Sequence, residues 1–267
     1  NGLQIFGQID KTPVAPGADL VAYSGFSADD YLMQPYNSDL DFGTGDFCVM
    51  GWFKNANVNA LLCARLLPQI YNTTGTDRGF LISFGSNGVL SFATYTQGFQ
   101  SGGRKSIGSQ NDMSGIDGWA HFVAVRDGGV MKLYINAIKE TSEVANSDDI
   151  SDNTTSIPLS IGCFNEISAN RFTGSTALIR ISSTVPTADQ IAKIYRDEKP
   201  LFQDGAQATL HGTSDAVTAL AYDDKTELLH VGTSSGRSDF AGLRRINNTT
   251  TAVTTSISAS NNLIAEQ

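Results

Sequence analysis

The stretch LDFGTGDFCVMGWFK, residues 40–54, decides the fold. A Gly-Thr-Gly-Asp turn at residues 43–46 leads into a run in which every second residue is apolar or small. These residues are Phe47, Val49, Gly51 and Phe53. Alternate side chains of a strand point to one face of its sheet. The run therefore predicts a strand with one face in a hydrophobic core.

The residues on the other face of this predicted strand, Cys48 and Met50, are also apolar. A strand with two apolar faces needs cover on both sides. We expect a second sheet on one side, and residues 1–28, residues 201–267 or another subunit on the other. The pattern thus indicates a multi-chain assembly.

Residues 119–136, WAHFVAVRDGGVMKLYIN, predict an antiparallel hairpin, because two alternating runs meet at an Asp-Gly-Gly turn. A second hairpin is predicted about the Gly-Ser-Asn-Gly turn at residues 85–88. Further strands are expected near residues 61–65, 158–163 and 176–183. Four polar stretches are too long for hairpin turns, so we expect them to be loops at the ends of a β-sandwich. They are residues 68–77, 96–118, 140–156 and 164–171.

One helix is predicted near the end of the sandwich. Thr187 and Gln190 form a capping box, in which each side chain satisfies a backbone N–H of the first turn. Ile191 and Tyr195 belong to an apolar stripe at helical spacing, and Pro200 prevents the helix from continuing.

These elements divide the chain into three parts: a lead-in of linker and short strands at 1–28, a β-sandwich at 29–200 and a small β appendage at 201–267. In the appendage, residues 217–222 and 228–233 predict a hairpin, and residues 243–246 predict a third strand. So small a sheet cannot bury its apolar face alone. We expect it to dock on the sandwich, on further repeats or on a neighbouring chain.

The formal net charge of −9 and the lack of any basic cluster argue against nucleic acid or anionic membranes as partners. No apolar run is long enough to insert into a bilayer, and there is no signal-peptide pattern. The chain begins at Asn1, so we expect a piece of a longer protein. The three cysteines, Cys48, Cys63 and Cys163, lie in apolar runs, and we expect buried free thiols.

The stretches 40–54 and 119–136 resemble laminin-G-like domains of the concanavalin A-like class. The phrases at 159–162, 172–174 and 177–181 continue the resemblance, which runs from about Tyr31 to Tyr195. It implies an all-β fold, an antiparallel jelly-roll β-sandwich closed by one short helix. It also implies a lectin, an adhesion module or a glycosidase, since the fold hosts all three. Residues 217–246 resemble one blade of a β-propeller.

The chain as a whole resembles virion structural proteins of marine bacteriophages, on the phrases at residues 31–47, 177–203, 212–246 and 256–263. This resemblance implies a tail fibre, tail spike or capsid decoration on the surface of an extracellular particle. It also implies other virion subunits as partners, a homo-oligomer with a trimer favoured, and binding of host-surface polysaccharide. The alternative is a purely structural assembly module without a ligand.

An enzymatic role is not favoured. A glycoside hydrolase of this class is expected to carry two carboxylates on one face of a strand, spaced as Glu-x-Asp-x-x-Glu, and the chain has no such run. We interpret His121 as a framework residue inside an apolar strand, and His211 and His230 as structural residues without partners.

Calcium binding stays open. Oxygen ligands could come from several acidic residues in turns. They are Asp29, Asp30, Asp41, Asp46, Asp148, Asp149 and Asp152. Related domains often carry an acidic pair where this chain has Ala177 and Leu178, which counts against a metal site of the family type.

A glycan site needs an aromatic ring to stack on a sugar, with amide and charged groups to fix its hydroxyls. Three polar stretches supply these groups, and they would form one rim if they shared an end of the sandwich. The candidates are Tyr71, Asn72, Tyr95, Phe99, Arg104, Asn165 and Glu166, with Gln100 and Asn170 beside them.

Overall fold

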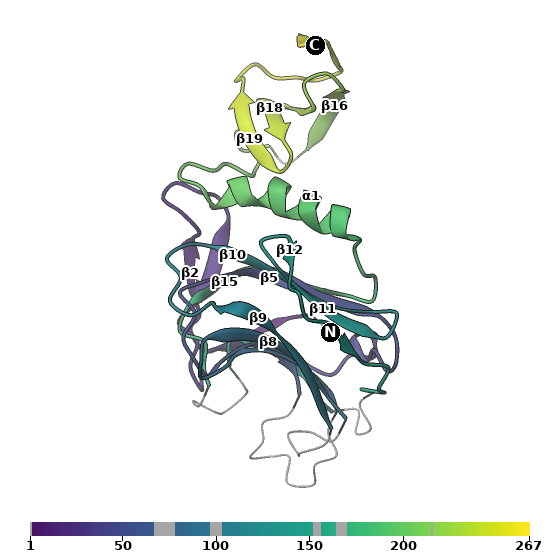
Figure 1. The fold of residues 1–267 in the computed structure, drawn as a ribbon. Coiled ribbons are helices and arrows are strands. Elements are labelled where there is room, and N and C mark those ends of the chain that lie inside the picture. The colour runs from purple at the N-terminus through teal and green to yellow at the C-terminus, as the bar shows by residue number, and fades with distance from the viewer. Residues whose placement is uncertain (1, 67–77, 97–102, 152–155, 164–169, 215) are drawn as a thin grey trace. The chain divides into compact units, whose positions relative to one another are not determined.

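The computed structural model describes residues 2–66, 78–96, 103–151, 156–163, 170–214 and 216–267 (Figure 1). The chain divides into two compact units. The first comprises Asn1–Thr12 and Ala22–Ala192, and the second comprises Pro13–Val21 and Lys193–Gln267.

The first unit is an antiparallel sandwich of two sheets, which confirms the predicted jelly-roll class. The seven-stranded sheet has the order β1 (Gln4–Phe6), β4 (Tyr31–Gln34), β14 (Leu159–Ile161), β6 (Ala60–Arg65), β7 (Gly79–Phe84), β8 (Val89–Tyr95) and β9 (Arg104–Asp112). The second sheet has the order β12 (Ile138–Lys139), β11 (Val130–Ile135), β10 (Ala120–Asp127), β5 (Phe47–Lys54), β15 (Ser175–Ser182), β3 (Val21–Ser24) and β2 (Asp10–Pro13), with β13 (Val144–Ala145) paired to β11. A single 3-10 turn, η1 (Ser38–Leu40), precedes β5 in the described chain.

The core lies between the two sheets, as the alternation in β5 and β10 predicts. Phe47, Val49 and Phe53 point inward beside Phe122 and Ala124 of the paired strand, and all five are fully buried. Gly51 shares this face, and a Cβ there would come within 2.5 Å of the Ile179 side chain. The glycine therefore lets β15 pack closely on β5.

The other face of β5 is buried too, as expected. Cys48, Met50 and Trp52 are at most 7% exposed within this one chain. Another subunit, one of the three covers considered, is not needed to bury them, so this burial is no argument for a multi-chain assembly. His121 lies on the same face with its ring centre 5.0 Å from that of Trp52, which fits the framework role predicted for it.

Two of the predicted loops are partly strands. Residues 96–118 contain β9, and residues 140–156 contain β13. β9 has the sequence RKSIGSQND, with one large apolar residue, Ile107, turned into the core. A strand at the sheet edge needs little apolar surface, so the polar sequence misled the prediction. The lead-in strands β1 and β3 pair with β4 and β15 and belong to the sheets.

The predicted helix is α1 (Ala188–Glu198), followed by the short 3-10 turn η2 (Lys199–Phe202). The capping box is confirmed: the Thr187 N–H donates to Gln190 Oε1 at 2.8 Å, and the Gln190 N–H donates to Thr187 Oγ1 at 3.3 Å. Ile191 of the apolar stripe is fully buried. Among the residues described, no helix is long and apolar enough to span a bilayer.

The second unit contains a four-stranded antiparallel meander of β16 (Val217–Asp223), β17 (Leu228–Thr233), β18 (Gly236–Ala241) and β19 (Arg244–Asn248). The predicted hairpin and the following run are confirmed, while β18 was missed because its sequence, GRSDFA, is mostly polar. A hairpin of β20 (Ile257–Ser260) and β21 (Leu263–Glu266) lies against the meander. The C-terminal stretch thus packs within its own unit.

Candidate functional site

The candidate site lies on the outer face of the seven-stranded sheet, the face turned away from the core. Its register places Ser83 of β7 beside Ser91 of β8 and Leu81 beside Ala93. On β9, Ser106 lies beside Ala93 and Arg104 beside Tyr95. Ser83, Ser91 and Ser106 are partly exposed on this face, while Leu81, Ala93 and Tyr95 beside them are buried.

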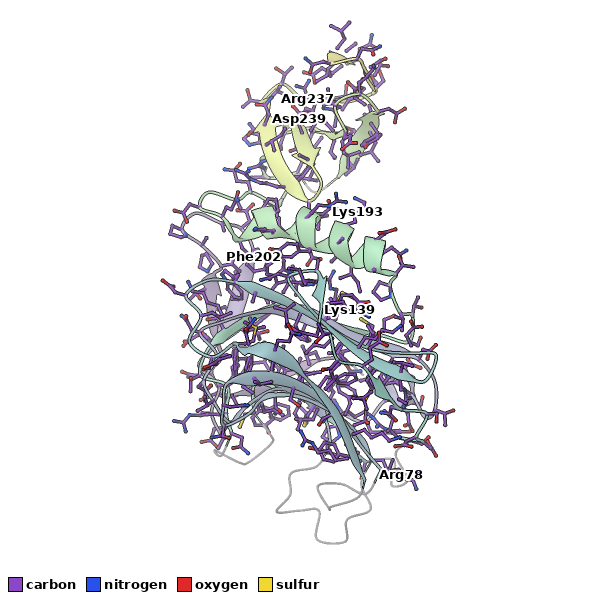
Figure 2. All side chains as sticks on the ribbon, viewed as in Figure 1. Arg78, Lys139, Lys193, Phe202, Arg237 and Asp239 are labelled. Atoms are coloured by element: carbon purple, nitrogen blue, oxygen red, sulfur yellow. The ribbon has the colours of Figure 1, made fainter. Side chains whose placement is uncertain are left out.

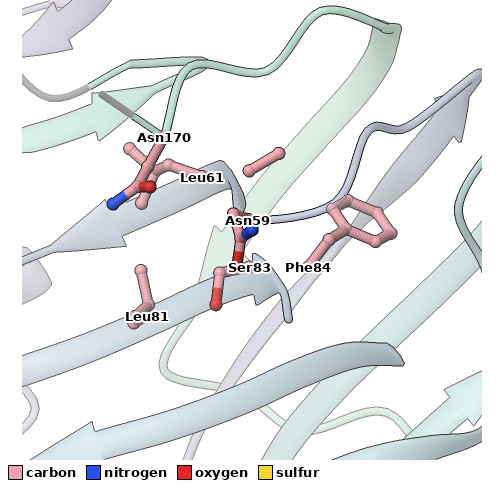
Figure 3. A pocket seen from close by; sticks show the side chains of 7 residues that line it. Asn59, Leu61, Leu81, Ser83, Phe84 and Asn170 are labelled. Atoms are coloured by element: carbon pink, nitrogen blue, oxygen red, sulfur yellow. The ribbon is translucent and has the colours of Figure 1, made fainter. Parts of the chain in front are cut away.

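A pocket of about 150 Å³ opens on this face near the end of β6 (Figure 3). Its floor is apolar and its polar atoms come from two asparagines and one serine. The lining residues are Asn59, Ala60, Leu61, Leu81, Ser83, Phe84 and Asn170. Sites for drug-sized ligands are about 300 Å³ or larger, so this pocket fits a smaller group.

The two asparagines are held in place by their backbones. Both have left-handed conformations, with φ of 55° at Asn59 and 63° at Asn170, which asparagine tolerates better than most residues. The Asn59 N–H donates to the Gly85 carbonyl at 3.2 Å, and the Asn170 carbonyl accepts from the Leu61 N–H at 2.6 Å. Their side chains are exposed.

Within the described ranges, the side-chain amides of Asn59 and Asn170 have no hydrogen-bond partner. The Ser83 hydroxyl has none there either. Together they offer donors and acceptors above an apolar floor of Leu61 and Leu81 (Figure 3). A sugar presents hydroxyls at its rim and C–H groups on its face, so this arrangement matches a single sugar unit.

Of the residues predicted to bind glycans, the structure describes Tyr95 and Arg104. They face each other across β8 and β9 at the opposite end of this outer face from the pocket. Tyr95 is only 3% exposed, while Arg104 is exposed. The other predicted residues lie outside the described residues. They are Tyr71, Asn72, Phe99, Asn165 and Glu166.

The three polar stretches that supply the predicted glycan-binding residues are 68–77, 96–118 and 164–171. The ends of the strands beside them show that these stretches do not all leave the sheet at the same end. Arg65, Gly79, Tyr95 and Arg104 lie at the same end of the sheet. β14 runs antiparallel to β6, so Cys163 lies toward the other end, beside Asn170 and the pocket. The described strands therefore do not meet the condition set for one rim, that the three stretches share an end of the sandwich. Asn170, from the third stretch, joins Asn59 and Ser83, which sequence analysis missed.

The acidic residues considered for calcium have other partners. Asp41 pairs with Arg65 at 2.8 Å, and Asp148 with Lys105 at 3.0 Å. Asp149 pairs at 3.2 Å with Arg78, which lies at the end of the sandwich in Figure 2. Asp30 accepts from the Ser27 hydroxyl and the Gln8 N–H, and Asp46 accepts from the Gly128 N–H. Asp29 lies in the turn before β4, and Asp152 is outside the described residues. In the part of the chain that the structure describes, no three metal-binding side chains converge.

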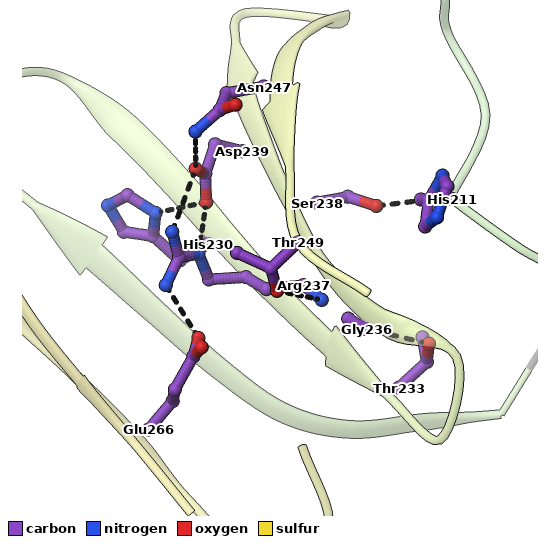
Figure 4. Close-up of polar contacts among 10 residues, drawn as sticks. All are labelled: His211, His230, Thr233, Gly236, Arg237, Ser238, Asp239, Asn247, Thr249 and Glu266. Carbon is purple, nitrogen blue, oxygen red and sulfur yellow. Dashed lines mark hydrogen bonds and ion pairs between the residues drawn. The ribbon is translucent and has the colours of Figure 1, made fainter. Parts of the chain in front are cut away.

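The second unit holds a buried polar network (Figure 4). Asp239 accepts from Arg237 Nε at 2.7 Å and from Asn247 at 3.1 Å, and it lies 2.7 Å from His230 Nδ1. Arg237 also pairs with Glu266 of the C-terminal hairpin. Burial raises the pKa of Asp239, but the hydrogen bonds from Arg237 and His230 outweigh it, so this pKa is lowered. The prediction that His230 has no partner is wrong.

This network joins four strands of the second unit, and its centre is closed to solvent, since His230 and Asp239 are at most 3% exposed. Its groups satisfy one another, so its role is structural. His211 lies nearby, and its backbone N–H donates to the Ser238 hydroxyl.

The comparisons with known proteins agree with this architecture. A laminin-G family model described as "Concanavalin A-like lectin/glucanases superfamily" matches residues 26–192. No curated protein matches the sequence significantly.

Solved structures share the fold at low sequence identity. Domain 4 of the extracellular arabinanase AbnA from Geobacillus stearothermophilus, in complex with arabinotriose, has a TM-score of 0.53 and 15% identity. The match covers 72% of this chain and 87% of that one. The binding domain of Paraclostridial Mosquitocidal Protein 1 has a TM-score of 0.55 and 11% identity, covering 89% of this chain and 60% of that one. The receptor-binding domain of botulinum neurotoxin type G has a TM-score of 0.52 and 12% identity, covering 91% of this chain and 59% of that one. The chain thus spans about 60% of the length of the two toxin domains.

Proposed function

Because the chain belongs to the concanavalin A-like lectin/glucanases superfamily, we propose that its sandwich is a non-catalytic glycan-binding module. The observation that carries this proposal is the pocket between Asn59 and Asn170, where unpartnered amides and a hydroxyl surround an apolar floor. The arabinotriose bound to AbnA domain 4 and the binding role of the toxin domains support the same use of the fold.

The chemistry of the pocket favours binding over hydrolysis. Glycosidic bond cleavage requires two carboxyl groups about 5 to 10 Å apart, one as acid and one as base or nucleophile. The residues that line this pocket include no aspartate or glutamate. Asparagine and serine can orient a sugar but do not supply that proton transfer.

We further propose that the module is displayed on a bacteriophage virion, as a tail fibre, spike or decoration, in a homo-oligomer with a trimer favoured. The resemblance of the whole chain to such proteins supports this setting. Host-surface polysaccharide would be the ligand. Immunogold electron microscopy of purified particles, with an antibody to this module, tests the display on the virion. Absence of labelling on intact virions would refute it.

A second candidate function, assembly without a ligand, is favoured by one surface of the second unit. Leu220 and Tyr222 of β16 and Leu229 of β17 share a face and are 61%, 54% and 37% exposed. β16 is an edge strand of its sheet. An exposed apolar face on the terminal strands of a sheet fits contact with another chain.

Binding to immobilised bacterial surface polysaccharides and oligosaccharides tests the main proposal. The informative variant is Asn59→Gly with Asn170→Gly, because glycine removes both amides and keeps the left-handed backbone. We expect a loss of at least tenfold in affinity. Asn55→Gly is the matched control, since Asn55 has φ of 53° and lies outside the pocket.

Two results would overturn the proposal. One is the absence of binding to every glycan, with or without divalent cations. The other is release of reducing sugar from a bound polysaccharide, which would reveal hydrolysis.

A further inference from the structure

The charge on the outer face of the seven-stranded sheet is concentrated in one side chain. Between the row of Tyr95 and the row of Ser91, the described strands place serine, alanine, glycine, leucine, methionine and glutamine on this face. Arg104 is the only charged residue among them. Among the residues that the structure describes in these rows, a ligand that contacts the exposed Arg104 meets one positive charge and no negative charge.

The other cations at this end of the sandwich are neutralised. Arg65, Arg78 and Lys105 each pair with an aspartate at 2.8 to 3.2 Å. Arg104 forms no ion pair with any carboxylate of the described chain, and its Nη2 atom lies 3.5 Å from the Ser91 hydroxyl. It also donates a hydrogen bond to the Tyr95 side chain, and because a guanidinium has five N–H donors, some of them stay available for another partner.

The residue beside Arg104 does not cancel its charge. Tyr95 is buried, and burial raises the pKa of its phenol even though Arg104 acts to lower it. The phenol is therefore neutral at physiological pH. Arg104 is exposed and donates a hydrogen bond to this phenol.

We propose that Arg104 binds the carboxylate of an acidic sugar, so that the module selects uronic-acid-bearing polysaccharide over neutral polymer. This inference rests on the proposed glycan-binding function. A planar guanidinium presents two parallel N–H donors that match the two oxygens of a carboxylate. The net charge of −9 repels polyanions at long range, so selectivity for an acid depends on this local contact.

Polygalacturonate and its methyl ester form the test pair, because esterification removes the charge and keeps the sugar. By calorimetric titration we expect wild-type protein to bind the acid form at least tenfold more tightly than the ester. Arg104→Gln should abolish this preference, and Arg104→Lys should retain only part of it. Arg196→Gln, at another exposed arginine, is the control and should keep the full preference.

Equal binding of acid and ester by wild-type protein would overturn the inference and leave the glycan-binding function standing. So would an Arg104→Gln variant that keeps the preference. Stronger binding of a sulfated polymer than of polygalacturonate would overturn the choice of carboxylate. If neither polymer nor any other glycan binds, both the inference and the proposed function fall.

Discussion

The guanidinium of Arg126 lies 5.1 Å from the centre of the Phe47 ring, deep in the sandwich. The side chain is fully buried and donates to the carbonyl oxygens of Gly43, Gly45 and Asp148 at 2.5 to 2.9 Å. Arg126 therefore links the turn at residues 43–46, which leads into β5, to the backbone at Asp148. This explains how the Gly-Thr-Gly-Asp turn, short of apolar residues, is held in the fold.

Replacing this arginine should destabilise the sandwich. Arg126→Lys keeps the charge but cannot reach three carbonyls at once, and hydrogen bonds to charged groups contribute about 1.5 to 3 kcal/mol each. We expect a loss of at least about 2 kcal/mol in the free energy of unfolding. Both tryptophans lie in the first unit, so urea unfolding followed by fluorescence reports on the sandwich. Arg104→Gln is the exposed control; an equal loss there would contradict this account.

His121 predicts a specific acid sensitivity. Burial, helped by the positive charge of Arg180, lowers the pKa of His121 from 6.5 to about 4. Below pH 6.5 the unfolded chain binds a proton that the folded chain does not bind until about pH 4. This residue should therefore remove on the order of 3 kcal/mol of stability as the pH falls through that window.

His121→Gln tests this prediction, because glutamine does not titrate. The free energy of unfolding, measured at pH 7 and pH 4.5, should fall less in the variant than in the wild type. The difference in the free energy of unfolding between the two proteins at pH 7 reports only how well glutamine packs in place of His121. Equal losses on acidification in both proteins would show that His121 is not the sensitive group.

Gly232 is predicted to be required for docking of the C-terminal hairpin. A Cβ at this position would lie 2.7 Å from Val253 Cγ1, so Gly232→Ala must push the hairpin segment away. Overpacking of this kind costs about 1 to 3 kcal/mol. Faster hydrogen exchange at Ile257 and its neighbours is the expected result. The double variant with Val253→Ala should recover part of the loss, and no recovery would argue against a steric cause.

The three cysteines should be unreactive in the native protein. Cys48, Cys63 and Cys163 are free and buried, and burial raises the pKa of their thiols to about 12, 12 and 11. Reaction with a thiol reagent at pH 8 should be slow when the protein is folded and yield three equivalents in denaturant. Rapid reaction of one thiol equivalent in the folded protein would show that one cysteine is accessible to the reagent.

Sequence reasoning recovered the elements whose physics is local. The alternation in β5 and β10, their turns and the capping box at Thr187 each depend on residues near one another in the chain. β9 escaped because an edge strand needs few apolar residues, and β18 because its polar side chains are satisfied by a network. His230 and Asp239 meet only through strand pairing, which no single run of sequence reveals.

The candidate site was only partly accessible to the same reasoning. Asn170 stood beside the predicted residues, but Asn59 is one of many asparagines in turns. These two residues line one pocket because β14 returns antiparallel to β6 and the Asn170 carbonyl accepts from the Leu61 N–H. Sequence analysis proposed Arg104 as one of several loop residues. That it is the one charged residue in these rows of the described outer face is evident only from the strand register.

A crystal structure of the protein with the tightest-binding oligosaccharide tests the central claim most directly. The account predicts a sugar unit seated between Asn59 and Asn170, with its hydroxyls hydrogen-bonded to their amides and to Ser83. A sugar bound elsewhere in the protein, with this pocket empty, would contradict it.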